Sequence, residues 1–117
     1  MNYLILGING EVGKAIFKAL YNSNDKFILT YNSKKPKLKN KNIFLYQLNF
    51  EKVENNISKI IKILRKFKKI DTVINNVGNA NPYRDILKVK PSDFNRSMKI
   101  NLYSPLYIIL EIIKKSL

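Results

Sequence analysis

The sequence predicts an α/β fold in which helices cover both faces of a parallel β-sheet. Short apolar runs alternate along the 117 residues with segments of helical periodicity. The first run leads directly into a glycine-rich turn that opens a helix, and the clearest amphipathic helix follows the third run. Alternation of this kind indicates right-handed crossovers between parallel strands, and the length corresponds to one domain.

The first strand, turn and helix are expected at the N-terminus. Residues 2–6 (NYLIL) form a short apolar run, as expected for a strand buried on both faces. Glycines punctuate residues 7–13, and apolar side chains then recur at helical spacing from Val12 to Leu20. The helix is expected to stop at residues 22–24.

Two further strands follow, at residues 26–31 (KFILTY) and 43–48. The lysine-rich stretch at residues 34–41 lies between them and contains Pro36, so it is expected as a loop. The second crossover is therefore short or irregular.

The second half begins with the clearest helix, residues 51–67, which has an apolar stripe opposite a basic face. Residues 71–75 (DTVIN) are the fourth strand. Pro91 marks the start of a last helix that runs to the end of the chain. A bend is expected at Pro105, because proline has no N–H to donate within a helix.

The composition limits the available chemistry. Because the chain has no Cys and no His, we exclude disulfides, thiol nucleophiles, Ser-His-Asp catalysis and zinc sites built from those ligands. Acid–base chemistry must therefore use carboxylates, Lys or Tyr.

The formal charge of +14 raises the question of polyanionic partners. However, 19 Lys, 16 Asn and 17 Ile share A/T-rich codons, and only 3 residues are Arg. No aromatic residues interleave with the basic run at 34–41 to act as stacking platforms. The longest apolar run, at 106–113, is interrupted by Glu111 and falls short of the ~18 residues of a membrane span. We expect no nucleic-acid or membrane partner, and cytoplasmic localisation because no signal segment is present.

The glycine turn is the first candidate site, because it follows a strand and opens a helix. Glycines allow a tight turn and close backbone approach, and the helix N-terminus offers N–H groups to a pyrophosphate. The alternative is a glycine-rich turn without a ligand. The position of the turn after the first strand favours nucleotide binding over this alternative.

Three motifs in order, LGINGEVG, INNVG and KINLYSPL, resemble the short-chain dehydrogenase/reductase family. The resemblance implies a Rossmann-type three-layer parallel sheet with strand order 3-2-1-4, truncated after the fourth strand and the following helix. Residues 1–117 would be the N-terminal, cofactor-binding half of that NAD(P)-binding domain. Its pyrophosphate site would lie over Gly7, Asn9, Gly10, Glu11, Val12 and Gly13.

This turn departs from the family pattern TGxxxGxG at two places. Glu11 stands at the middle glycine, where a carboxylate would repel a pyrophosphate unless it points outward, although Gly10 supplies an alternative GxxGxxG spacing. Glu11 also has a purely structural explanation, since an acidic residue stabilises the first turn of a helix. Leu6 replaces the usual Thr.

The cofactor is expected to be NADP rather than NAD. The end of the second strand has no carboxylate for a ribose hydroxyl, and Ser33 with Lys34 could meet a 2′-phosphate. Alternatively, Lys34 merely begins the solvated loop. After the third strand, the resemblance implies that Gln47, followed by Leu48, faces the adenine amine.

The resemblance also implies roles for residues after the fourth strand. Asn75, Val77 and Gly78 match the family's NNAG segment beside the nicotinamide ribose, with Val77 in place of Ala. Asn101 matches the family's catalytic Asn, whose backbone carbonyl holds a water in a proton relay.

The family's catalytic Ser and Tyr-xxx-Lys pair would follow on elements beyond residue 117. Tyr31 and Lys35 have the right spacing but lie at a strand end and in a loop, so they are rejected. We therefore expect an NAD(P)-dependent oxidoreductase of a small carbonyl or alcohol that is truncated or split and inactive alone. The alternative is a noncatalytic nucleotide-binding or oligomerisation module. Expected partners are the nucleotide, a second copy of the chain or a complementing C-terminal half.

Overall fold

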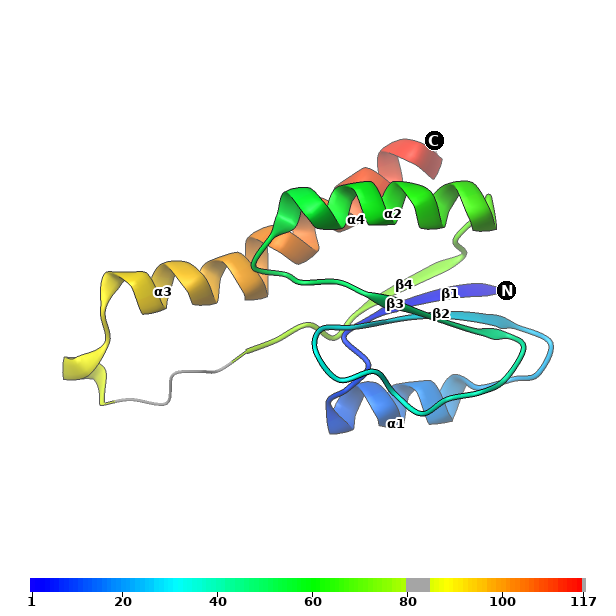
Figure 1. Ribbon diagram of the computed structural model, residues 1–117, viewed down its shortest axis with the longest axis horizontal. Coiled ribbons are helices and arrows are strands. Elements are labelled where there is room, and N and C mark those ends of the chain that lie inside the picture. The colour runs from blue at the N-terminus through cyan, green and yellow to red at the C-terminus, as the bar shows by residue number, and fades with distance from the viewer. Residues whose placement is uncertain (80–84, 117) are drawn as a thin grey trace.

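A four-stranded parallel sheet organises the chain, in the order β3-β2-β1-β4 (Figure 1). The computed structural model describes residues 1–79 and 85–116. The inner strands are β1 (Asn2–Leu6) and β2 (Lys26–Tyr31), and the outer strands are β3 (Ile43–Gln47) and β4 (Thr72–Asn75). The predicted strand order is confirmed. β3 ends one residue before, and β4 begins one residue after, the bounds expected from the sequence.

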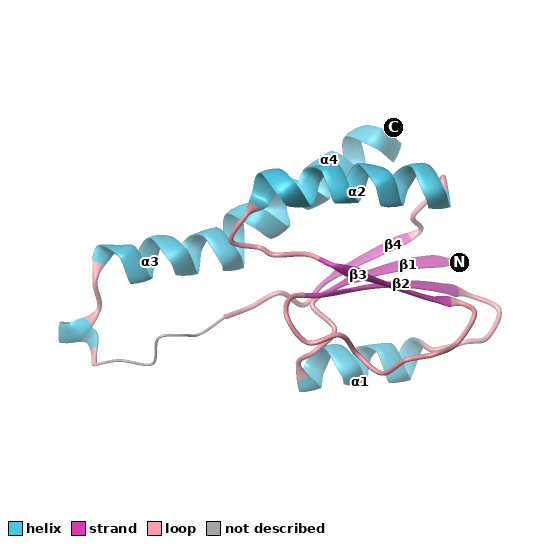
Figure 2. Cartoon of the chain, in the orientation of Figure 1, coloured by secondary structure: helices cyan, strands magenta, loops and turns pink. Residues whose placement is uncertain are grey.

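Helices cover both faces of this sheet (Figure 2). α1 (Glu11–Leu20) lies on one face, and α2 (Val53–Phe67) and α4 (Ser104–Ser116) lie together on the other. α2 begins two residues later than expected. The connection from β2 to β3 contains no helix, as its Lys and Pro content predicts, and Leu38 of this loop packs against the apolar cluster on the α1 face.

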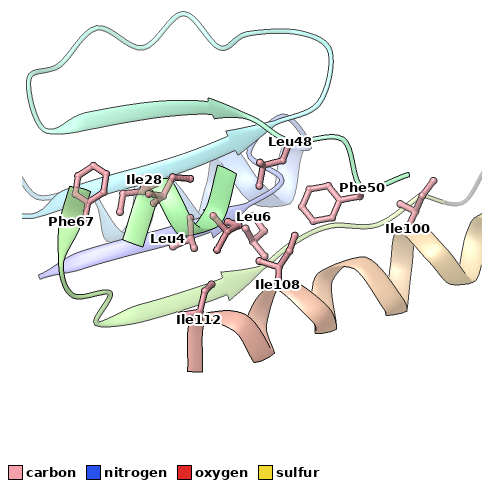
Figure 3. Close-up of a cluster of buried hydrophobic side chains, with 11 residues drawn as sticks. Leu4, Leu6, Ile28, Leu48, Phe50, Phe67, Ile100, Ile108 and Ile112 are labelled. Carbon is pink, nitrogen blue, oxygen red and sulfur yellow. The ribbon is translucent and has the colours of Figure 1, made fainter. Parts of the chain in front are cut away.

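Alternating side chains of the inner strands feed two apolar clusters. Leu4, Leu6 and Ile28 face α2 and α4, where they meet buried residues such as Ile108 (Figure 3). Ile5 and Phe27 belong to the cluster on the α1 face. Burial on both faces explains why the sequence of these strands is apolar without alternation.

The C-terminal helix is divided into three parts. α3 (Pro91–Met98) follows a 3₁₀ turn, η1 (Ile86–Lys88), and continues through a π-helical turn, η2 (Lys99–Tyr103), into α4. The Ser104 N–H donates to the carbonyl of Lys99, five residues back. The sequence predicts a bend at Pro105, and the irregular turn lies immediately before it because proline cannot supply the next helical N–H.

Candidate cofactor-binding site

A cleft of about 310 Å³ opens where β1, β2 and β4 end, at the carboxyl edge of the sheet. In open parallel sheets, ligands bind at this edge, next to the point where the strand order reverses. The segment after β3 and the helices α3 and η2 complete the wall. Six residues predicted from the sequence line this cleft: Gly7, Asn9, Gly10, Ser33, Val77 and Gly78.

The first glycine of the turn is required by its conformation. Gly7 has a φ of +81°, a region that favours glycine, and a Cβ there would lie 3.0 Å from the carbonyl oxygen of Asn76. Its N–H donates to Oγ1 of Thr30 at 3.0 Å, and the next amide, of Ile8, donates to the Thr30 carbonyl at 2.9 Å. The turn is therefore tied to the neighbouring strand β2.

The third glycine brings the helix against the turn. A Cβ on Gly13 would lie 2.6 Å from the Gly7 carbonyl oxygen and 2.7 Å from Nδ2 of Asn76. Nδ2 of Asn76 donates to this same Gly7 carbonyl at 2.8 Å. The sequence interpretation missed Asn76 and chose Asn75, whose Oδ1 instead accepts the Val77 N–H at 3.2 Å. Asn76 differs in that it closes the turn from the end of the neighbouring strand β4.

The start of α1 is open toward the cleft. Gly10 is its N-cap and has no side chain with which to satisfy the first helical amides. The side chains of Glu11 and Val12 are exposed and lie outside the cleft lining. The carboxylate of Glu11 therefore does not line the site. The repulsion of a pyrophosphate that the sequence alone led us to consider is avoided.

The end of β2 forms a second wall. Asn32 and Ser33 line the cleft, whereas Lys34 is exposed beside it. Nδ2 of Asn9 donates to the Lys34 carbonyl at 2.5 Å and so ties this segment to the glycine turn. No carboxylate occurs in residues 31–35.

The segment after β3 reaches the cleft two residues later than the sequence interpretation placed it. Gln47 and Leu48 do not line the cleft. Nε2 of Gln47 donates to the Asn32 carbonyl at 2.8 Å, and Leu48 is fully buried in the core. Asn49 and Phe50 line the cleft instead. The sequence offered one signal: with β3 ending near Gln47, the first residues free of the sheet are those that can turn toward a ligand.

After β4, Asn101 holds the backbone of the segment that lines the cleft. Its Oδ1 accepts the N–H of Asn79 at 2.7 Å, and its Nδ2 donates to the Asn79 carbonyl at 2.8 Å. Nδ2 also contacts Oγ of Ser97 at 3.1 Å. Asn101 lies in η2, and Pro105, four residues on, has no N–H for its carbonyl.

Charged groups of opposite sign meet at one side of the cleft. Nε of Arg96 donates to Oε1 of Glu51 at 2.8 Å, and its Nη2 bonds the same oxygen.

Away from the cleft, beside the amino end of β4, a hydrogen bond from Lys69 and one from the Asn2 N–H hold the pKa of Asp71 below its ordinary value. Within residues 1–79 and 85–116, no group of three or more His, Cys, Asp or Glu side chains is placed to bind a metal ion.

A sequence model of the short chain dehydrogenase family matches residues 2–116, so the chain belongs to this family of NAD(P)-binding oxidoreductases. No curated protein matches the sequence significantly. In the part of the chain that the structure describes, no helix is long and apolar enough to cross a membrane.

The fold is similar to that of several solved structures. A short-chain dehydrogenase/reductase from Saccharomyces cerevisiae has a TM-score of 0.86 at 17% identity, with 98% of this chain and 48% of that chain covered. A 3-oxoacyl-[acyl-carrier protein] reductase from Brucella melitensis has a TM-score of 0.81 at 22% identity, with coverage of 97% and 49%. ElxO with NADP bound has a TM-score of 0.82 at 23% identity, also with coverage of 97% and 49%. The chain spans about half the length of these structures.

Proposed function

We propose that these 117 residues form the cofactor-binding half of an oxidoreductase that transfers a hydride between NAD(P) and a carbonyl or alcohol. The observation that carries this proposal is the glycine turn. Gly7 and Gly13 leave no room for a Cβ, and the uncapped start of α1 faces a cleft at the carboxyl edge of the sheet. Backbone N–H groups at such a helix start suit the two charges of a pyrophosphate.

Other residues of the cleft fit the remaining parts of a dinucleotide. Asn32 and Ser33 would meet the adenosine ribose, and Asn49 and Phe50 would border the adenine. The nicotinamide ring would supply the hydride donor or acceptor. Asn101 would hold the Asn79 backbone with its side chain, while its carbonyl, which Pro105 cannot bond, would hold a water for proton transfer.

A charge placed at the helix start tests the pyrophosphate site. Asp is a good N-cap, and a Cβ on Gly10 would meet only one atom within 4 Å, Nδ2 of Asn76 at 3.9 Å, so Gly10→Asp should fold normally. Its carboxylate should abolish NADPH binding, measured by nucleotide fluorescence and calorimetry. Asn24→Asp makes the same charge change in the exposed turn after α1 and should bind like the parent. Equal binding by both variants would place the nucleotide elsewhere.

We propose NADP as the preferred cofactor. Support comes from the lack of a carboxylate in residues 31–35, from Ser33 in the cleft wall and from the exposed Lys34 beside it. NADP⁺ should bind more tightly than NAD⁺, and Lys34→Gln should reduce this ratio, whereas Lys62→Gln on the solvated face of α2 should not. Tighter binding of NAD⁺ would reverse the assignment.

By itself, the 117-residue chain should bind cofactor without turning it over. The residues include Asn101 but not the Ser and the Tyr-xxx-Lys pair that the family resemblance implies. The outer edge of β4 has no strand beside it in the described part of the chain, so a C-terminal half could add a parallel strand there. Robust carbonyl-dependent NADPH oxidation by the isolated chain would contradict this proposal.

A second candidate function, a noncatalytic or self-associating nucleotide-binding module, is favoured by one surface. Exposed apolar side chains follow one another along α3, η2 and α4, namely Phe94, Leu102, Tyr103, Leu106, Tyr107, Leu110 and Ile113. An apolar surface of this kind favours association. Sedimentation should then show a dimer or larger species, and Leu110→Glu should shift it to monomer. A monomeric parent chain would remove this candidate.

A further inference from the structure

Three consecutive residues after β3 are each bonded to a different helix. The first, Asn49, is bonded to α2 by both backbone groups: its N–H donates to Oδ1 of Asn56 at 3.0 Å, and its carbonyl accepts from Nδ2 of Asn56 at 2.6 Å. Asn56 is 1% exposed, so this side chain serves the loop and not solvent.

The next two residues are bonded to α4 and α3, respectively. The carbonyl of Phe50 accepts the hydroxyl of Ser104, at the start of α4, at 2.5 Å. Glu51 accepts two N–H groups of Arg96 in α3. No residue of α3 is buried, so Arg96 supplies an attachment that apolar packing does not.

The same three residues form part of the cleft wall, and the helix they hold carries Asn101. We propose that residues 49–51 are a junction that sets the position of Asn101 relative to the nucleotide, and that Ser104 and Arg96 are positioning residues for this site. This inference rests on the proposed function, since it concerns the geometry of the same cleft.

Ser104 gives the sharpest test because it is fully buried and cannot touch a ligand. Any effect of its hydroxyl on nucleotide binding must pass through Phe50 or the helix. Ser104→Ala should weaken NADPH binding about tenfold, the worth of one good hydrogen bond. It should also move the amide proton resonance of Asn79, which reports the bond from Asn79 to Asn101.

An exposed helical serine is the control for loss of a hydroxyl outside the junction. The hydroxyl of Ser58 in α2 donates to the carbonyl of Asn55 at 3.0 Å, away from the junction. Ser58→Ala should leave both the NADPH affinity and the Asn79 resonance unchanged. Ser104→Thr keeps the hydroxyl and should hold the resonance near its parent position. An unchanged Asn79 resonance in a folded Ser104→Ala variant would overturn the inference.

The Glu51–Arg96 pair can be tested by exchange of its charges. Because Arg96 itself lines the cleft, the Asn79 resonance is the deciding readout. Arg96→Met should shift this resonance, whereas Arg65→Met on the exposed face of α2 should not. Arg96→Glu combined with Glu51→Arg rebuilds the pair in reverse and should recover the resonance that Arg96→Glu alone loses. Failure of the double variant to recover any of it would show that the pair does not position the helix.

The two proposals fail in different ways. If the parent chain binds neither NADPH nor NADH, the proposed function is wrong, while the Asn79 resonance in these variants still decides whether the junction holds Asn101. If the nucleotide binds and the junction variants bind it with parent affinity and resonances, only the positioning role is wrong.

Discussion

Gly13→Ala should destabilise the chain strongly, although alanine is the better helix former. The new Cβ would lie 2.6 Å from the Gly7 carbonyl oxygen and 3.1 Å from that of Ile8, both backbone atoms that cannot rotate away. Forced overpacking of this kind costs about 3 kcal/mol, and the helix propensity of alanine returns up to about 1 kcal/mol. The net loss of about 2 kcal/mol should lower the melting temperature by about 10 °C.

Gly10→Ala is the matched control, measured with Gly13→Ala by urea and thermal denaturation followed by circular dichroism. Its Cβ would meet only Nδ2 of Asn76, at 3.9 Å, and its φ of −70° suits any residue. The loss of a glycine cap should cost less than about 1 kcal/mol. If the two variants were equally stable, the close approach of α1 to the glycine turn would be refuted.

Three further variants test the rest of the molecule, each by urea denaturation. Asn76→Ala removes the side-chain bond that closes the glycine turn and should cost about 1 kcal/mol or more, whereas the exposed Asn55→Ala should change stability by less than about 0.5 kcal/mol. The pKa of Asp71 is lowered in the folded chain. The ionised carboxylate therefore stabilises the fold at pH values above the ordinary pKa of Asp, which is about 4. Asp71→Asn should therefore be less stable at pH 7, by a margin that closes as the pH falls below about 4; a margin independent of pH would argue against the contact. Ile108→Ala in the core should cost about 2–5 kcal/mol, far more than Leu110→Ala on the exposed side of α4, and equal losses would contradict the packing of that helix.

The elements of the fold could be read from local patterns because each depends on its own residues. Apolar runs such as residues 2–6 indicate strands buried on both faces, and the alternation with helices restricts the connections to right-handed crossovers. The irregular β2–β3 connection was predicted for the same reason, since Lys and Pro at 34–41 oppose a helix. The observed ends of β3, β4 and α2 differ from the predicted ones by one or two residues, because local propensities are weakest at the ends of elements.

The candidate site was predicted less completely. The glycine positions follow from backbone chemistry, which local sequence reveals. The roles of Asn76, Asn49 and Glu51 depend on which residues the fold brings beside them. A chain rich in Asn gives no signal to separate Asn76 from Asn75. Gln47 and Asn49 likewise differ only in where β3 ends and how its loop turns.

By itself, the sequence determined the class of fold, the order of its elements, the glycine turn and the family, because these depend on residue type and spacing along one strand or helix. Only the tertiary structure decided that Asn76 closes the turn, that Asn49 and Phe50 reach the cleft, and that residues 49–51 join three helices. These contacts link residues that lie up to 69 positions apart in the chain. Their geometry is set by the twist and register of the sheet, which no local pattern encodes.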